Sequence, residues 1–151
     1  FAEGGVDPSF VVQDVGTYEF CMSTIFTKII RGEIPCHKIA ENDHYFAFLD
    51  IRPIRPGHTL VVPKVETDYI FDLDDDVLGG IMNFSRPIAK ALEKSVPCAR
   101  VGIIVAGLEV PHAHVHLVPF NAIGDLSFAN ARPETQEHLA EVASRIRGNL
   151  E

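Results

Sequence analysis

The 151-residue sequence predicts an α+β fold built on an antiparallel sheet. β-rich segments follow one another with only short turns between them, which is typical of neighbouring antiparallel strands. One long segment carries apolar residues at every third or fourth position, as an amphipathic helix does. A shorter helical pattern closes the chain. We therefore expect a sheet of about five strands with a long helix and shorter helices packed on it.

The first half of the chain predicts a short helix followed by three strands. The helix covers residues 25–31 and ends at Gly32, with Pro35 a little further on. Two prolines and a glycine make residues 52–57 a loop, and Pro63 stops the strand that comes after it. The three strands are expected at residues 36–41, 45–50 and 58–62.

A long helix is expected to begin at residues 74–76, which are three aspartates. Carboxylates at a helix N-terminus are favoured by the helix dipole, so we prefer this interpretation to a metal site for the acidic run. Pro87 lies inside the helix and should bend or break it. One apolar stripe defines the buried face: Val77, Ile81, Phe84, Ile88 and Leu92.

The second half predicts two more strands and a last helix. Residues 100–105 and 112–119 have strand character, and the segment 107–111 between them reads as a turn. Pro133 is expected to open the last helix. Its inward-facing residues would be Leu139, Val142 and Ile146.

The length and composition predict one domain over residues 22–151. Residues 1–21 contain four carboxylates and no Lys or Arg, and Met22 then reads like a natural start. We interpret this leader as a vector-derived remnant or a disordered extension, because it lacks the basic start and apolar centre of a signal peptide.

Charge and cysteine content exclude several classes of function. The net charge of −8 argues against broad affinity for nucleic acid, and no apolar run is long enough to span a membrane. The three cysteines, at positions 21, 36 and 98, form neither a CxxC pair nor a disulfide framework. This usage predicts a reducing compartment, the cytoplasm.

Three alternating histidines form the most informative stretch, because His112, His114 and His116 lie two residues apart. In a strand, such side chains share one face. Histidine is a common zinc ligand, but three in a row would span about 13 Å of backbone, so they cannot easily share one ion. A zinc site would need one or two of them plus ligands from elsewhere.

Phosphorus chemistry suits the row better. A neutral imidazole carries a proton on one ring nitrogen and a lone pair on the other. If an acceptor holds the proton in place, the free nitrogen can attack phosphorus. Flanking imidazoles that donate hydrogen bonds would stabilise the charge on the phosphate oxygens. An affinity tag is a poor alternative, because this row is internal and bounded by apolar strand residues.

The segment 112–118 matches the His-φ-His-φ-His-φ-φ motif, where φ is an apolar residue, of the histidine triad (HIT) superfamily. The resemblance extends over Ser23 to Phe120. Residues 24–35 look like the N-terminus of the Hint branch, and residues 48–53 and 56–64 look like its central hairpin. The chain is closer to Hint than to the Fhit branch, which cleaves dinucleoside polyphosphates. The resemblance therefore implies a HIT-like fold.

The resemblance also implies roles for four histidines. His114 would be the nucleophile that attacks the α-phosphorus of a nucleotide and forms a nucleotidyl-histidine, which water then hydrolyses. The backbone carbonyl of His112 would accept the proton on His114. His116 would contact phosphate oxygens, and His58 would complete the polar cluster; the alternative for His58 is a satisfied strand histidine.

Other positions would hold the nucleotide. Asp50 aligns with the acid that binds the ribose hydroxyls, although it could instead cap the turn at Arg52. Gly107 and Glu109 are expected beside the phosphate and its leaving group. An apolar slot for the base would be formed by residues that could otherwise be plain core: Ile25, Phe26, Ile29, Phe48, Leu49 and Ile51.

The chain departs from the family pattern at two places. Many relatives have Gly-Gln and a small polar residue before the triad, whereas this chain has Gly107, Leu108 and Glu109. Leu108 cannot supply an amide hydrogen bond, and an ionised Glu109 would repel phosphate. Some relatives bind zinc through cysteines near the Ile-Phe pair. Thr24 and Thr27 stand there in this chain, so no structural zinc is expected.

The sequence thus predicts a hydrolase of purine nucleoside phosphoramidates or related nucleotidyl conjugates, with no metal and no cofactor. The resemblance further implies a homodimer, with no nucleic-acid or membrane partner expected. Three alternatives remain open at this point: a dinucleoside polyphosphate hydrolase, a nucleotide-binding regulatory protein with little turnover, and a metal-binding domain.

Overall fold

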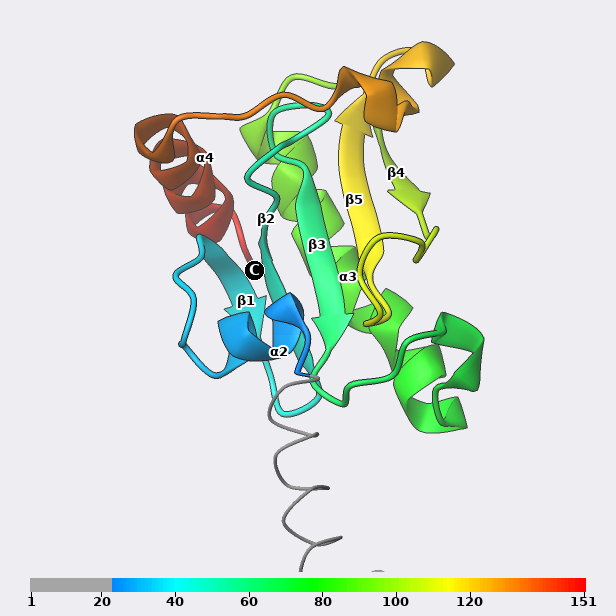
Figure 1. Ribbon diagram of the computed structural model, residues 1–151. Helices are drawn as coiled ribbons and strands as arrows, with labels where there is room; N and C mark the ends of the chain where they lie inside the picture. The colour runs from blue at the N-terminus through cyan, green and yellow to red at the C-terminus, as the bar shows by residue number, and fades with distance from the viewer. Residues whose placement is uncertain (1–22) are drawn as a thin grey trace, which may run out of the picture.

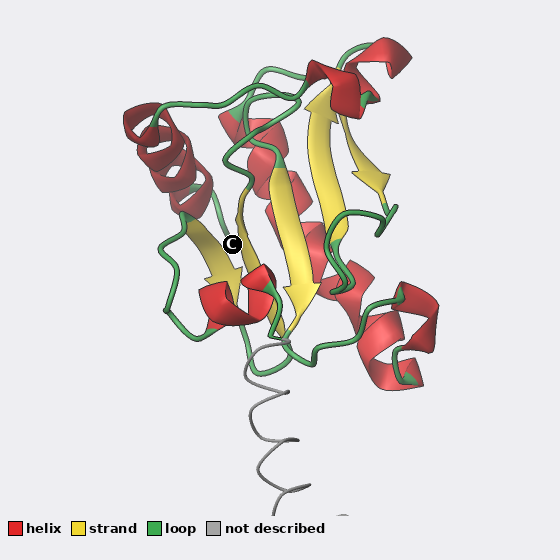
Figure 2. Cartoon of the chain, in the orientation of Figure 1, coloured by secondary structure: helices red, strands yellow, loops and turns green. Residues whose placement is uncertain are grey.

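The computed structural model describes residues 23–151, and its five strands form one antiparallel sheet (Figures 1 and 2). The spatial order is β1-β2-β3-β5-β4, and each neighbouring pair is antiparallel. This confirms the predicted α+β class. The leader interpreted from residues 1–21 lies outside the described residues. The strands are β1 (Lys38–Glu41), β2 (Tyr45–Leu49), β3 (Thr59–Pro63), β4 (Arg100–Ile104) and β5 (Val115–Phe120).

The start of β5 differs from the prediction, because the strand begins at Val115 and not at His112. Its pairing with β3 ends where Val61 faces Val115. The preceding amides bond elsewhere: His112 N donates to Val110 O at 2.8 Å and Ala113 N donates to Thr67 O at 2.7 Å. These bonds hold the segment 112–114 against loops, outside the ladder, so two of the three histidines precede the strand.

One face of the sheet packs against the two longer helices, α3 (Asp75–Ser95) and α4 (Gln136–Gly148). Figure 1 shows α3 running along the back of the sheet. The predicted stripe of α3 is confirmed, because Ile81, Ile88 and Leu92 are buried and the other two residues pack against the same core. Burial of such side chains contributes about 1.5–3 kcal/mol each, so this layer supplies most of the packing that fixes the sheet.

Pro87 does not break α3, contrary to the prediction, and the helix continues through it to Ser95. Both Pro87 and Asn83, whose carbonyl lies one turn earlier, are exposed. Water can therefore satisfy the carbonyl that loses its amide partner. Ile81 and Ile88 are buried on either side, and their packing holds the helix together across the proline.

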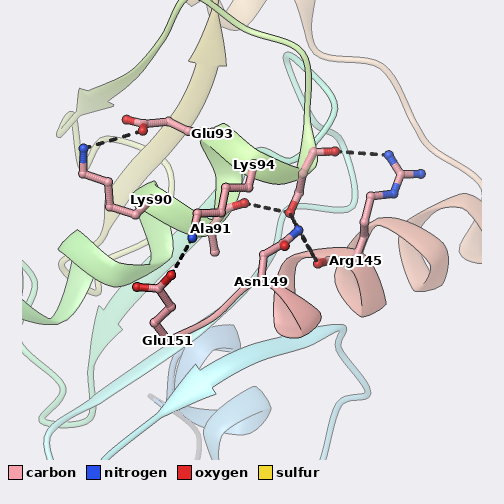
Figure 3. A network of polar contacts seen from close by, with 8 residues as sticks. Lys90, Ala91, Glu93, Lys94, Arg145, Asn149 and Glu151 are labelled. Carbon is pink, nitrogen blue, oxygen red and sulfur yellow. Dashed lines mark hydrogen bonds and ion pairs between the residues drawn. The ribbon is translucent and has the colours of Figure 1, made fainter.

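The C-terminal helix begins later than predicted, at Gln136 and not at Pro133, because Thr135 is the N-cap and accepts from His138 N at 3.2 Å. A polar network joins the end of α4 to the end of α3 (Figure 3). Arg145 donates to Ser95 O at 3.1 Å, and Asn149 donates to Ser95 Oγ at 2.9 Å. The predicted inward residues of α4 are all buried: Leu139, Val142 and Ile146.

The other face of the sheet carries the short helix α2 (Ile25–Ile30). A smaller apolar cluster lies beneath α2. Three 3₁₀ turns flank this face: η1 (Ile70–Asp72), η2 (Ile123–Leu126) and η3 (Phe128–Asn130). Within residues 23–151, no helix combines the length and apolar character needed to cross a membrane.

Candidate active site

The histidines gather on the α2 face of the sheet. His116 lies directly opposite Leu60 across the β3–β5 pair, and residues directly opposite share a face. The ring of Phe26 in α2 contacts both remaining triad rings, with centroids 5.8 Å from His112 and 5.0 Å from His114. The rings of His114 and His116 lie 4.9 Å apart. The three imidazoles thus lie on one side of the sheet, as expected, although only His116 belongs to a strand.

The tautomer of His114 follows from one hydrogen bond. Its Nδ1 lies 2.7 Å from the backbone carbonyl oxygen of His112. A carbonyl only accepts, so Nδ1 must carry the proton and donate. In the neutral ring, Nε2 then keeps its lone pair. The structure therefore presents an unprotonated ring nitrogen at the position that the sequence assigned to the nucleophile.

A second chain of hydrogen bonds fixes His58 and His116. The amide of Ile54 donates to His58 Nδ1 at 3.1 Å, so His58 carries its proton on Nε2. That Nε2 lies 2.8 Å from His116 Nδ1 and donates to it. His116 in turn carries its own proton on Nε2. The relay from Ile54 thus turns His116 into a neutral hydrogen-bond donor.

Burial keeps this pair of histidines neutral. Loss of solvation, reinforced by the neighbouring His114, lowers the pKa of His58 to about 4. Burial also lowers the pKa of His116 to about 3, with further contributions from His58 and His114. At neutral pH both rings are therefore neutral, and His116 can act on an anion as a dipolar donor and not as a cation.

His112 is oriented from the other side. Its Nε2 lies 2.8 Å from Pro63 O and donates to it, which leaves Nδ1 to accept from Thr24 Oγ1 at 2.8 Å. Thr24 is also the N-cap of α2, because its side chain accepts from Thr27 N. Glu66 Oε1 accepts from Thr24 N at 2.6 Å and from Thr27 Oγ1 at 2.7 Å. These bonds connect the N-terminus of α2 to His112 and to Glu66.

Replacing Thr24 with valine should lower the free energy of unfolding by about 2–3 kcal/mol. The change removes the cap of α2 and the 2.8 Å hydrogen bond to the buried Nδ1 of His112. Urea unfolding monitored by circular dichroism measures the loss. Thr135→Val is the matched control, because it removes only the cap of α4, which is worth about 1 kcal/mol. Equal losses in the two variants would contradict the assigned bond to His112.

Asp50 has one of the two roles that the sequence left open, the cap of the turn at Arg52. Its Oδ1 accepts from Arg52 N at 2.8 Å and so caps the turn. Its Oδ2 lies 3.8 Å from His58 Nε2 and accepts no hydrogen bond from residues 23–151. Burial raises the pKa of Asp50, although the Arg52 amide and the neighbouring His114 act against that shift. One carboxylate oxygen therefore remains available for hydroxyl groups.

The predicted base slot is only partly assembled. Phe26, Ile29 and Phe48 are buried together in the cluster beneath α2, while Ile25 and Ile51 are exposed. Leu49 was wrongly assigned to this slot. It follows Phe48 in β2, so it points to the opposite face and packs in the core under α3 and α4.

The loop after β4 borders two cavities beside His114. A cavity of about 130 Å³ is lined by Gly107 and Glu109 together with His114, His116 and the ring of Phe128. We call it the phosphate cavity. Gly107 has φ +78°, a backbone conformation that glycine adopts without strain. A larger cavity of about 490 Å³ lies on the other side of the same loop.

The metal hypothesis meets a specific obstacle. Ligand-type atoms of Asp50, His58 and His116 lie within 4.8 Å of one another. To coordinate a metal through Nε2, however, His58 would have to shed the proton there while Nδ1 still accepts from Ile54 N–H. The ring cannot satisfy both demands as a neutral imidazole. His58 and His116 are better explained as part of a hydrogen-bonded relay from Ile54.

Sequence reasoning missed two contributors. Glu66 anchors α2, and Phe128 lies edge-on to His116 with ring centroids 5.0 Å apart. Neither residue lies in a recognisable motif, and only the tertiary structure brings them to the triad.

Comparison with known proteins gives a consistent family. The HIT domain model matches residues 31–122. An uncharacterized HIT-like protein of Methanocaldococcus jannaschii is 38% identical over 131 residues, covering 82% of this chain and 98% of that protein. The adenosine 5′-monophosphoramidase of Saccharomyces cerevisiae is 39% identical over 100 residues, which cover 63% of this chain and 61% of the yeast protein. A crystal structure of a HIT-like protein from Bartonella henselae superimposes with a TM-score of 0.75 at 33% identity, covering 85% of this chain and 96% of that one.

Proposed function

This chain belongs to the HIT domain family, and we propose that it hydrolyses purine nucleoside phosphoramidates, or related nucleotidyl conjugates, at the α-phosphorus. The observation that carries the proposal is the tautomer of His114. Its Nδ1 proton is held by His112 O at 2.7 Å, and its Nε2 lone pair is left for phosphorus.

The chemistry would proceed in two balanced steps. His114 Nε2 forms a bond to phosphorus as the phosphorus–nitrogen bond of the substrate breaks, and the leaving amine departs after gaining a proton from solvent. The phosphorylated ring is then an imidazolium, stabilised by its Nδ1–H bond to His112 O. Water next attacks phosphorus, the bond to His114 breaks, and one proton returns to solvent.

The neighbouring groups suit this reaction. His116 Nε2–H, set by the relay through His58, would donate to a phosphate oxygen as negative charge develops there. Asp50 Oδ2 would accept from the ribose hydroxyls. Ile25, Phe26 and Ile51 would contact the base from α2 and the end of β2.

The lining of the cavities favours a phosphoramidate over a dinucleoside polyphosphate. Among residues 23–151, no Lys or Arg lines either cavity beside His114, whereas Asp68 lines the larger cavity and Glu109 the smaller one. A polyphosphate chain would carry several negative charges into this region without a cation to offset them. The yeast relative, named as an adenosine 5′-monophosphoramidase, supports the same choice.

Mass spectrometry of protein quenched during turnover of adenosine 5′-phosphoramidate tests the proposal. We expect an adenylyl adduct on His114 and on no other residue. An adduct on another histidine would overturn the assignment. Tight binding of the nucleotide with neither adduct nor product would instead support a regulatory protein with little turnover.

The homodimer and the cytoplasmic location expected from the sequence stay predictions. β4 is an edge strand that pairs only with β5, and Ile103 on it is exposed, which supports pairing with a second copy. Sedimentation equilibrium would measure the mass of the assembly, and a monomer at micromolar concentration would contradict the dimer.

A further inference from the structure

The ring of His112 is fixed at both of its nitrogens by groups that lie far apart in the sequence. Thr24 Oγ1 donates to Nδ1 at 2.8 Å, and Nε2 donates to Pro63 O at 2.8 Å. The backbone carbonyl of the same histidine accepts from His114 Nδ1 at 2.7 Å. Any displacement of His112 therefore moves the acceptor that orients the ring of His114.

Glu66 connects the two groups that hold His112. Its Oε1 accepts from Thr24 N at 2.6 Å and from Thr27 Oγ1 at 2.7 Å. Pro63 ends β3 and lies only a short stretch of chain before Glu66. The bonds thus close a ring, because the chain itself returns from Pro63 to Glu66. In order, this ring passes through Glu66, Thr24, His112 and Pro63.

The segment that contains Glu66 also supports the residue between two of the histidines. Thr67 O accepts from Ala113 N at 2.7 Å, and Ala113 is buried. Residues 63–67 therefore hold the stretch from His112 to His114 at two points, one on a side chain and one on the main chain. Glu66 fastens this supporting segment to α2.

Through α2 the same bonds reach His114 by a second route. The ring of Phe26 lies edge-on to the rings of His112 and His114, with centroids 5.8 Å and 5.0 Å away. Phe26 and Ile29 are buried in the cluster beneath α2, so we expect this packing to keep the helix on the sheet when Glu66 is replaced. The bonds to Glu66 determine where the N-terminal end of α2 lies.

The side chain of Glu66 is exposed, so water and salt screen its negative charge. Its contribution to the site is then the acceptance of two hydrogen bonds by one oxygen. A glutamine carbonyl oxygen has two lone pairs and can accept the same two bonds. Substitution can therefore separate the acceptor role of Glu66 from its charge.

From this ring of hydrogen bonds we propose that Glu66 is a positioning residue for the attack on phosphorus. It holds Thr24 against His112 and so keeps the ring of His114 in one orientation. It acts through the bonds that it accepts and not through its charge. The inference rests on the proposed function, since the orientation of His114 affects catalysis only if that residue is the nucleophile.

Single-turnover kinetics with adenosine 5′-phosphoramidate test this role, because rapid quenching gives the rate constant for formation of the adenylyl adduct on His114. Glu66→Ala should lower this rate constant by about 10- to 100-fold, the scale expected when a reacting group is misplaced by up to about 1 Å. Glu66→Gln should retain most of the rate. The affinity for AMP, measured by equilibrium dialysis, should change little in either variant, because Asp50 and the residues proposed to contact the base remain.

Glu141→Ala is the matched control. It removes an exposed carboxylate that pairs with Arg145 outside both cavities, so the rate constant for adduct formation should equal that of the unaltered protein. Thr27→Ala removes one of the two bonds that Glu66 accepts, and it should slow adduct formation less than Glu66→Ala does. This variant keeps a good helix former in α2, so it carries the test if Glu66→Ala does not fold.

A second measurement requires no turnover. NMR of isotope-labelled protein reports the exchange of the His114 Nδ1 proton with solvent, which the bond to His112 O slows. Exchange should be faster in Glu66→Ala and unchanged in Glu66→Gln. A purely structural Glu66 would lower the free energy of unfolding on replacement, yet it would leave the adduct rate constant and the proton exchange of the folded protein unchanged.

The remaining outcomes separate the positioning role from the function on which it rests. Adduct formation by Glu66→Ala at the rate of the unaltered protein would overturn the positioning role and leave the phosphoramidase proposal standing. A Glu66→Gln variant as slow as Glu66→Ala would also overturn it, because the charge would then be the active property. If the unaltered protein formed no adduct, the proposed function would fall, and the positioning role with it.

Discussion

Replacing His114 with alanine is expected to reduce turnover of adenosine 5′-phosphoramidate by roughly 10⁴-fold or more, the scale seen when a covalent nucleophile is removed. Within residues 23–151, His114 is the one triad ring that keeps a nitrogen lone pair outside these hydrogen bonds. In His116 the relay from His58 makes Nε2 a donor, and in His112 both ring nitrogens are engaged. Steady-state release of AMP measures the effect.

The fold should survive this change. His114 contributes one buried ring that bonds to a carbonyl of its own segment, so the circular dichroism spectrum should match that of the unaltered protein. His44→Gln, which alters an exposed histidine remote from both cavities, is the control and should retain full turnover. Turnover by His114→Ala within 10-fold of the unaltered protein would refute covalent catalysis through this residue.

The second large effect is a loss of stability on mild acidification. The folded pKa values of His58 and His116 lie at about 4 and about 3, below the ordinary value of 6.5 that applies once the chain unfolds. Between these pKa values the unfolded chain binds protons that the folded chain does not bind. The contribution of the two neutral histidines to the free energy of unfolding is therefore fully present above pH 6.5 and is lost as the pH falls. Each group contributes about 1.4 kcal/mol per pH unit. The free energy of unfolding should decrease by roughly 3 kcal/mol between pH 6.5 and pH 5.

His58→Gln isolates one of the two groups. The glutamine carbonyl can accept from Ile54 N–H and its amide can donate to His116, yet it does not titrate. In urea-unfolding series measured with this variant, the loss between pH 6.5 and pH 5 should shrink by roughly 1.5 kcal/mol, the share of His58. His44→Gln should leave the loss intact. Asp50, whose pKa burial raises, acts in the opposite direction at lower pH, so the measurement stays above pH 5. An unchanged pH dependence in His58→Gln would contradict a buried neutral His58.

The proposed function and the acid response depend on the same feature, which is a set of imidazoles whose protons are assigned by their neighbours. Three acceptors or donors of the main chain make the assignments: His112 O for His114, Pro63 O for His112, and Ile54 N for His58. A side-chain substitution does not remove a main-chain carbonyl or amide. The tautomers should therefore be retained when neighbouring side chains are replaced. Substitution can instead remove side chains that contact these segments, such as Thr24, which bonds to His112.

The sequence predicted most of the fold because its patterns are local. The strand character of residues 45–50 and 100–105 and the period of α3 are set by neighbours within one element. The predictions were wrong where contacts with segments distant in the sequence determine the local structure. Pro87 was expected to disrupt α3, but Ile81 and Ile88 pack on a sheet that the local pattern does not contain. The strand expected from His112 starts at Val115, because the amide of Ala113 bonds to Thr67.

The sequence by itself indicated the family and the α+β class, and the resemblance to that family implied four histidines and Asp50 as candidate site residues. It could not determine which ring nitrogen of each histidine is protonated. That depends on bonds such as Ile54 to His58 and Thr24 to His112, and the second of these joins segments 88 residues apart. Only the tertiary structure decided these bonds, along with the removal of Leu49 from the base slot and the cavities beside His114. Hydrogen-bond partners and cavities are properties of packed surfaces, and no periodicity in the chain encodes which surfaces meet.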